Sequence, residues 1–175
     1  MSRMVRESEI SGLRERLFFA RTLLDSLKAD GGEPHGYRLA LRGAVVFHLY
    51  SVLLGLMRQA AKSYRVPGFE QMLSLASLEQ AFADCQVESP EASLISQARR
   101  QTGGLIGWLE QEMFAACGAS GMARRPLPPA EEGSLAIELQ DPATPLGETD
   151  LQRLRDCHQE VTRLVAESQP YSEEW

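Results

Sequence analysis

The chain has 175 residues, of which 43% are hydrophobic and 24% are charged, and this balance predicts one globular domain, not a disordered or fibrous chain. The net charge of −6 is uneven, because residues 1–67 carry +5 and residues 68–175 carry −11. We expect this asymmetry to hold complementary faces of the fold together, and a surface for an anionic partner is the alternative.

The N-terminal sequence MSRMVRESE is charged and lacks an apolar core, so it does not predict a secretory signal. The three cysteines form no CxxC pair, which gives no zinc or thioredoxin signature. Their odd number argues against a disulfide framework and for a reducing compartment. We therefore expect a cytoplasmic protein.

A first helix is predicted over residues 8–29, where apolar residues recur at steps of three and four. These residues are Ile10, Leu13, Leu17, Ala20, Leu24 and Leu27. Phe18, Phe19 and Leu23 are expected to widen the apolar face beyond a coiled-coil stripe, which favours a helical bundle.

The second predicted helix runs over residues 34–65, with Pro34 in its first turn and the sequence VPG after its end. At about 1.5 Å per residue it would be about 48 Å long. Its stretch RGAVVFHLYSVLLGLM is the most apolar run of the chain. A membrane span is one interpretation, but such a span needs about 20 apolar residues without charge.

Polar residues and one glycine recur every three or four positions along the same helix. The polar seam that they form consists of His48, Ser51, Gly55, Arg58, Gln59, Lys62 and Arg65. A helix that faces lipid gains nothing from such a seam, whereas a helix enclosed by neighbours on most sides needs one facing water. We therefore predict the central helix of a soluble bundle.

A third helix is predicted over residues 69–85, with a capping-box pattern at Ser77 and Gln80. A fourth is predicted from Pro90, with Ser89 as its N-cap, to Gly118. Three glycines fall within the segment 102–107, where each costs about 1 kcal/mol relative to alanine. We expect a kink or short break at 102–104, and a close approach of another helix is the alternative.

Residues 119–147 hold five prolines and are predicted to form a loop within a single domain that spans residues 1–175. Inside the loop, SLAIELQ (134–140) alternates apolar and polar residues, as a short strand does. It would lie along the bundle or pair between protomers. RRPLPP (124–129) resembles a polyproline ligand, but a stiff loop is the simpler interpretation.

The last helix is predicted from Thr149, with Gln152 as its capping-box partner, to Pro170. Its inner stripe consists of Leu151, Leu154, His158, Val161 and Val165. The tail YSEEW follows, and Trp175 is expected to pack on the bundle or on a partner because a terminal tryptophan is poorly suited to water.

Arg42 and His48 are the candidate catalytic pair. An arginine followed four to six residues later by a histidine resembles the signature of the HEPN superfamily. The resemblance implies a helical bundle that cleaves RNA without metal, with His48 as acid or base and Arg42 on the phosphate. In the simpler interpretation, His48 lies at the edge of the core. Arg42 then either snorkels toward water or pairs with an acid of the first helix, such as Asp25 or Glu15.

The sequence predicts no metal and no cofactor. The Glu-x-x-His motif of di-iron bundles is absent, because Gly32, Val45 and Arg155 stand three residues before the three histidines. There is no glycine-rich phosphate loop. A pocket for a small apolar ligand beside His48, Ser51 and Gln59 is a further hypothesis.

Several segments together resemble a family of short proteobacterial proteins of unknown function. They include RLFFARTLL, FHLYSVLLGLMRQAAKSYRV, SLASLEQAFADCQVESPEA, WLEQ, IELQD and LQRLRDCHQEVTRLVAESQPYSEEW. The resemblance covers nearly the whole chain and consists of helix and packing residues. It implies a cytoplasmic bacterial helical protein and carries no activity.

We predict an all-α, up-and-down bundle of four to five helices around the 34–65 helix. The leading function is a non-enzymatic interaction or regulatory protein that self-associates, because the apolar stripes of the first and last helices and the aromatic tail exceed what one small bundle needs to bury. An HEPN-like ribonuclease or RNA-binding module is the first alternative. A bundle that binds a small apolar ligand is the second. We expect no membrane and no nucleic-acid partner for the leading function.

Overall fold

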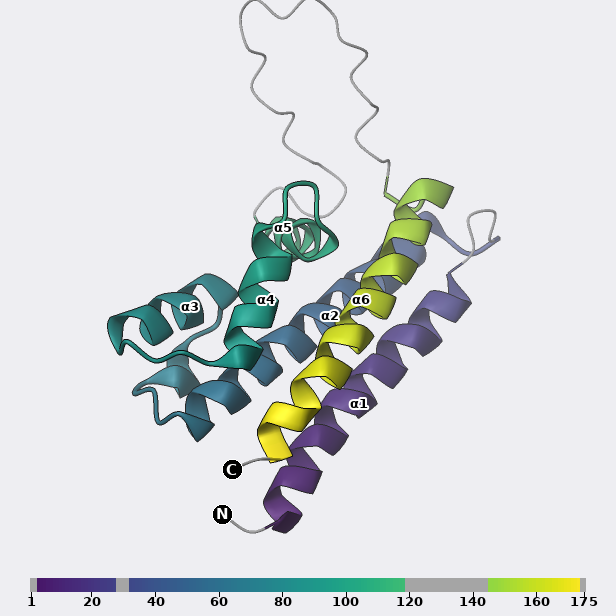
Figure 1. Ribbon diagram of the computed structural model, residues 1–175. Coiled ribbons are helices and arrows are strands. Elements are labelled where there is room, and N and C mark those ends of the chain that lie inside the picture. Colours follow the sequence, from purple (N-terminus) through teal and green to yellow (C-terminus); the bar gives the residue numbers. More distant parts are fainter. Residues whose placement is uncertain (1–2, 28–31, 119–144, 174–175) are drawn as a thin grey trace, which may run out of the picture.

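The computed structural model describes residues 3–27, 32–118 and 145–173, and side chains within 11–27, 32–118 and 145–169. Six α-helices and one short 3-10 helix occupy these ranges (Figure 1). They are α1 (Arg3–Ser26), α2 (His35–Ser63), η1 (Phe69–Gln71), α3 (Leu75–Asp84), α4 (Pro90–Arg100), α5 (Leu105–Cys117) and α6 (Glu148–Glu173). No strand is present in the described part of the chain, so the predicted all-α bundle is confirmed.

The three long helices form one side of the molecule. α1 runs antiparallel to both α2 and α6, and the three contact one another along their lengths (Figure 1). The short helices α3, α4 and α5 pack on another side of α2, and α4 and α5 also contact α6. α2 therefore touches every other α-helix, which confirms its predicted central position.

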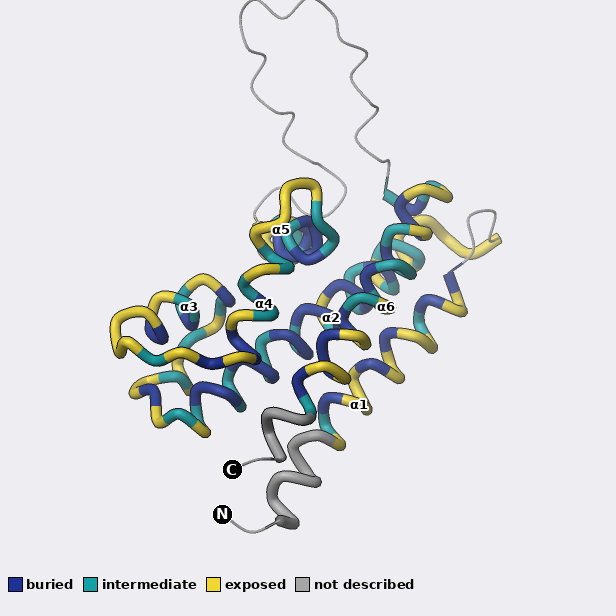
Figure 2. Tube along the Cα trace, in the orientation of Figure 1, coloured by how far each residue is buried: buried dark blue, intermediate teal, exposed yellow. Residues whose placement is uncertain are grey.

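α2 is unbroken through Gly55 and buries 11 of its residues (Figure 2). Val45, Leu49, Val52, Leu53 and Met57 are completely enclosed. Residues of the predicted polar seam are half-buried or exposed at each of its seven positions, from His48 to Arg65. Exposure is wider than the seam, however, because Tyr37, Ala40 and Phe47 are also exposed.

By length and composition alone, α2 is the one helix of the described ranges that could cross a membrane. Its most apolar window has a mean hydropathy of 1.7, and 44% of that window is buried inside the protein. Central helices of soluble bundles have the same composition, since neighbouring helices surround them.

The predicted stripes of α1 and α6 pack inward. Leu13, Leu17, Ala20 and Leu24 of α1 are buried, as is Leu27 directly after it, whereas Ile10 lies outside the described side chains. Leu151, Leu154, Val161 and Val165 are buried on α6, with His158 half-buried. These stripes meet each other and α2, so they do not exceed what the bundle buries. The prediction that Phe18 and Phe19 widen the buried face of α1 is wrong, because they are 65% and 41% exposed.

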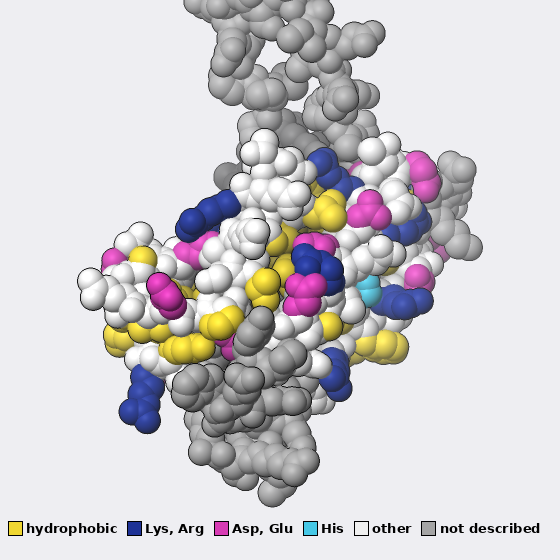
Figure 3. Space-filling model, viewed as in Figure 1, with side chains coloured by type: hydrophobic (Ala, Val, Ile, Leu, Met, Phe, Trp, Pro, Cys, Tyr) yellow, Lys and Arg dark blue, Asp and Glu magenta, His cyan; other side chains and the backbone are white. Residues whose placement is uncertain are grey.

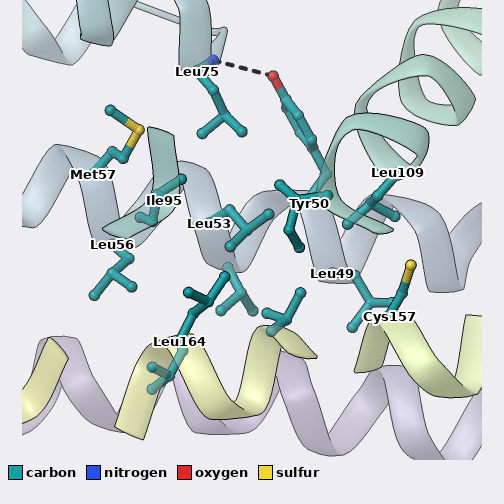
Figure 4. Packing of buried hydrophobic residues seen from close by; sticks show 14 of the residues in the cluster. Leu49, Tyr50, Leu53, Leu56, Met57, Leu75, Ile95, Leu109, Cys157 and Leu164 are labelled. Carbon is teal, nitrogen blue, oxygen red and sulfur yellow. Dashed lines mark hydrogen bonds between the residues drawn. The ribbon is translucent and has the colours of Figure 1, made fainter. Parts of the chain in front are cut away.

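Tyr50 connects the central helix to α3. Its hydroxyl accepts a hydrogen bond from the backbone N–H of Leu75, the first residue of α3, at 3.2 Å (Figure 4). The ring extends from α2 toward Leu75, and both residues belong to the buried cluster (Figure 4). The hydroxyl thus satisfies a backbone group at a helix start that would otherwise be buried without a partner.

Local signals in the sequence set the start of α4 and the break before α5. Ser89 caps α4 by accepting from the N–H of Ala92, and Pro90 is the first helical residue, as predicted. The predicted break is also confirmed, because α4 ends at Arg100 and α5 begins at Leu105, with Gly103 at a φ of +69°. A positive φ favours glycine, since a side chain there is strained.

Other boundaries differ from the prediction. α3 is capped by Ser74, not Ser77, because the Ser74 hydroxyl accepts from the Ser77 N–H. Gln152 donates to Asp156 and not back toward Thr149. The prediction that Pro170 ends the last helix is wrong, because α6 continues as far as Glu173. A proline this close to the helix end removes only one backbone hydrogen-bond donor, so its cost is small there.

Four predictions fall wholly or mostly outside the described residues. They concern the loop 119–147, the strand-like segment 134–140, the polyproline-like segment 124–129 and Trp175.

Candidate functional site

Arg42 lies inside the protein, where α2, α5 and α6 meet. Its side chain is 1% exposed. Nε and Nη2 donate to the two carboxylate oxygens of Asp150 at 2.7 and 2.6 Å, and Nη2 also lies 2.8 Å from a carboxylate oxygen of Glu112. A planar guanidinium matches a carboxylate in this two-bond geometry. Of the two alternatives, the ion pair is confirmed and snorkelling is wrong, but the partners predicted in the first helix are also wrong.

Ion pairs and an aromatic contact offset the cost of burying the charge of Arg42. Burial by itself lowers the pKa of Arg42, but the bonds and charges of Asp150 and Glu112 outweigh burial and raise it. The guanidinium carbon lies 6.0 Å from the centre of the Trp108 ring, and that of Arg153 lies 5.1 Å from the same ring. Arg42 is therefore a permanently charged, fully engaged structural group.

Asp150 has a second role in the same cluster. Its Oδ2 accepts the backbone N–H of Leu146 at 2.9 Å, in addition to the Arg42 bond. Leu146 has a φ of +72°, which is unusual for a residue with a side chain. Asp150 therefore fixes the turn that leads into α6 and attaches it to the central helix.

The side chain of His48 points from α2 toward α1. Its ring makes edge contacts with Phe19 of α1 and Phe47 of α2, each with centroids 5.6 Å apart. Its Nδ1 is buried and lacks a protein hydrogen-bond partner in the described structure. Burial, followed by the positive charge of Arg16, lowers the pKa of His48. The neutral imidazole is therefore the favoured form near pH 7.

The structure does not bring the predicted catalytic pair together. Arg42 points to α5 and α6, whereas His48 points to α1. Six residues on an α-helix turn through about 600°, which leaves the two side chains about 120° apart. No phosphate could reach Arg42 without displacing Asp150 and Glu112.

A groove lies beyond His48 on the same exposed side of α2. It has a volume of about 510 Å³ and is bordered by α1, the C-terminal half of α2 and η1. Of the three residues predicted to border a ligand pocket, Gln59 lines this groove and His48 and Ser51 do not. Sequence reasoning placed Gly55, Arg58 and Lys62 in the polar seam, but it missed Arg16 and Phe69, which tertiary packing brings to the groove.

An aromatic patch, defined here as Phe18, Phe19, Phe47 and His48, lies next to the groove. Phe18 and Phe19 have ring centroids 6.2 Å apart, and Phe19 and Phe47 both contact His48. The hydrophobic pattern of α1 did not predict this patch, because Phe18 and Phe19 could have faced either the core or the solvent.

Metal binding and thiol chemistry have little support in the described ranges. Among those residues no group of three or more His, Cys, Asp or Glu side chains could hold a metal ion. Cys85 and Cys117 are exposed, and Cys157 is buried with its thiol 3.5 Å from the carbonyl oxygen of Leu105. Burial raises the pKa of Cys157 to about 12, which makes it unreactive.

The face formed by α6 carries charges of both signs in close proximity (Figure 3). Arg163 bonds to Glu160 and Glu167 one turn away on either side, at 2.6 Å. Such exposed pairs are typical of a solvated helix face and contribute little to stability.

Comparison with known proteins gives one match. No curated protein and no solved structure matches the chain significantly. The model of a family of unknown function (DUF6586) matches residues 10–175, which is nearly the entire chain and includes all of the side chains described above. The chain therefore belongs to this family of unknown function.

Proposed function

We propose that this protein is a non-enzymatic interaction protein of the bacterial cytoplasm that associates with a second copy of itself. The contact surface would be the outward face of α2 and the adjoining edge of α1. One observation carries the proposal. Between Arg38 and Arg58 the only charged residue of α2 is Arg42, and Arg42 is turned inward.

The outward face of α2 is consequently without charge over several turns. Tyr37 and Phe47 are 52% and 54% exposed, and Phe18 and Phe19 extend the apolar surface across α1. A solvated helix face normally carries charged and polar residues, as α6 does. Exposed apolar patches of this kind mark interaction sites, and aromatic residues are enriched at the centres of protein interfaces.

The pattern of residue sizes supports a second copy of the chain. Between Tyr37 and Phe47 three small residues, Ala40, Gly43 and Ala44, are exposed or half-buried, beside the larger half-buried Arg38, Leu39 and Leu41. Two antiparallel copies of α2 that cross at these small residues would place the aromatic rings of each copy beside the small residues of the other. Twofold symmetric contacts of this self-complementary type are the commonest among soluble oligomers.

Sedimentation equilibrium over a range of concentrations tests the proposal. The wild-type protein should show a concentration-dependent dimer, and Phe47→Glu should be a monomer with unchanged circular dichroism. Leu73→Glu is the control, because Leu73 is 74% exposed but lies outside the patch. A strict monomer at high concentration would refute self-association. Flotation of the wild-type protein with liposomes would instead identify the face as a membrane contact.

The ribonuclease alternative has no comparable support. It would require Arg42 at a surface and close to His48, whereas Arg42 is buried in two ion pairs. The proposal of an interaction protein does not depend on either residue reacting.

A further inference from the structure

The groove between α1, α2 and η1 has the composition of a small-molecule site. We propose that it binds a soluble organic anion, in which one acidic head group is attached to a short apolar body. Its volume of about 510 Å³ is within the range of roughly 300–1,000 Å³ that is typical of ligand pockets. This site is separate from the proposed dimer contact, although both lie on the exposed side of α2.

The positive charge of the groove selects the head group. Arg16, Arg58 and Lys62 line it, and Glu70 is the single acidic residue among its lining residues. Lys62 has a further interaction of its own, so the excess of positive charge rests on the guanidinium groups of Arg16 and Arg58 against the one carboxylate. A concave wall strengthens the attraction to an anion, because less water screens the charges.

Arg58 is held in place by bonds that leave part of its guanidinium available. Nε donates to the carbonyl oxygen of Met72 at 3.0 Å, and Nη2 donates to those of Glu70 and Met72 at 3.1 and 2.5 Å. These bonds anchor η1 against α2. Among the described residues, no partner of Nη1 is found, so a positioned donor is left for a carboxylate or phosphate.

Arg16 is positioned in a similar way from the opposite wall. Its Nη1 donates to the backbone carbonyl oxygen of Ser51 at 3.1 Å. This bond holds the guanidinium across the α1–α2 contact, which it reaches because Gly55 has no side chain. A Cβ at Gly55 would lie 3.4 Å from Nη1 of Arg16 and 2.8 Å from Cδ2 of Leu13.

Apolar residues provide the surface for the body of the ligand. Leu13 and Phe69 line the groove between the charged side chains. This mixture of apolar walls and a few directed polar groups is typical of sites for amphiphilic small molecules. An inorganic anion would leave the apolar walls in contact with water and should bind more weakly.

Gly12 is the least expected residue of the lining. It lies within α1, where glycine costs about 1 kcal/mol relative to alanine. Packing does not require it, because a Cβ at this position would meet no atom within 4 Å. The absence of a side chain at Gly12 keeps the groove open. This role accounts for a glycine that helix stability disfavours.

The test is calorimetric titration of the purified protein with four probes. Octanoate and octyl phosphate should bind, whereas octanol and inorganic phosphate should bind at least about ten-fold more weakly, because each lacks one of the two parts that the groove would recognise. Equal binding of octanol and octanoate would overturn the role of the charges. Binding only to phosphatidylglycerol vesicles, and not to free octanoate or octyl phosphate, would overturn a soluble ligand.

Variants locate the site within the groove. Arg16→Gln should weaken octanoate binding by about five-fold, as expected for the loss of one partly exposed ion pair. Arg14→Gln is the matched control, because Arg14 is an exposed arginine of α1 that does not line the groove. Equal effects of the two substitutions would contradict the assignment.

A variant that fills the groove with a larger side chain should remove the binding site without removing a charge. Gly12→Leu should fold, because there is space for the added Cβ, and it should abolish octanoate binding. Thermal melting of the variant verifies that the fold is retained. A folded Gly12→Leu protein that binds octanoate as well as the wild type does would overturn the proposal, and this result would leave the proposed dimer unaffected.

Discussion

Arg42 of α2 and Asp150 of α6 are 108 positions apart in the chain and form a buried ion pair with two hydrogen bonds of 2.7 and 2.6 Å. The pair connects the basic first third of the sequence to the acidic remainder. It therefore supports the expectation that complementary charges hold parts of this fold together. It also explains why the most apolar helix contains an arginine.

Asp150→Asn should strongly destabilise the protein. The substitution keeps the shape of the side chain and removes its charge, which leaves Arg42 buried with Glu112 as its remaining acidic partner. Loss of one member of a buried ion pair costs about 3–5 kcal/mol, and we expect a value near the lower end because Glu112 is retained. Urea denaturation followed by circular dichroism gives the free energy of unfolding.

Asp156→Asn is the control for this experiment. Asp156 lies on the same helix, is half-exposed and accepts a bond from Gln152 at 2.9 Å. Its replacement should change the free energy of unfolding by less than about 1 kcal/mol. Similar losses for the two variants would show that the buried pair has no special role.

His48 should make the stability depend on pH. Its pKa in the folded protein is lowered, first by burial and then by the charge of Arg16. The unfolded chain therefore binds more protons than the folded protein as the pH falls through about 6.5. The stability that neutral His48 contributes is fully present above that pH. It decreases as the pH falls toward the pKa of His48 in the folded protein, which is lower.

His48→Gln should remove this part of the pH dependence. Denaturation at pH 7.5 and pH 5.5 should show a larger loss of stability for the wild type than for the variant. His35→Gln is the control, because His35 is exposed at the start of α2. If the His48 variant lost as much stability as the wild type between the two pH values, the environment described for this ring would be incorrect.

Two glycine substitutions should have opposite effects on stability. Gly103 has a φ of +69° between α4 and α5, and alanine there should cost roughly 1–2 kcal/mol. Gly12 lies in α1 with space around it, and alanine there should stabilise the protein by up to about 1 kcal/mol. Thermal melting of Gly103→Ala and Gly12→Ala measures both changes. Effects of the same sign would contradict one of the two local conformations.

The three cysteines should differ in reactivity. Cys85 and Cys117 are exposed, whereas Cys157 is buried with a pKa of about 12. Iodoacetamide at pH 8 should therefore alkylate two thiols of the folded protein and the third only in denaturant. Mass spectrometry counts the added groups, and Cys157→Ser is the variant that identifies the protected site. Rapid labelling of three thiols in the native protein would contradict the burial of Cys157.

The sequence alone determined the helical fold and its central element. The spacing of Leu13, Leu17, Ala20 and Leu24 predicted the buried stripe of α1, because apolar side chains on one face of a helix must find a neighbour. Ser89 followed by Pro90 predicted the start of α4, and glycines near Gly103 predicted the break before α5. These features depend on backbone conformation and on residues a few positions apart.

Tertiary structure decided which long-range partners meet. The partners of Arg42 are more than sixty positions away in the chain, and no local pattern distinguishes Asp150 or Glu112 from other acidic residues. Helical periodicity likewise could not show that Phe18 and Phe19 face outward, because a face is buried only where another helix covers it. The groove has the same origin, since Arg16 and Phe69 approach Gly55 only when α1, α2 and η1 pack together.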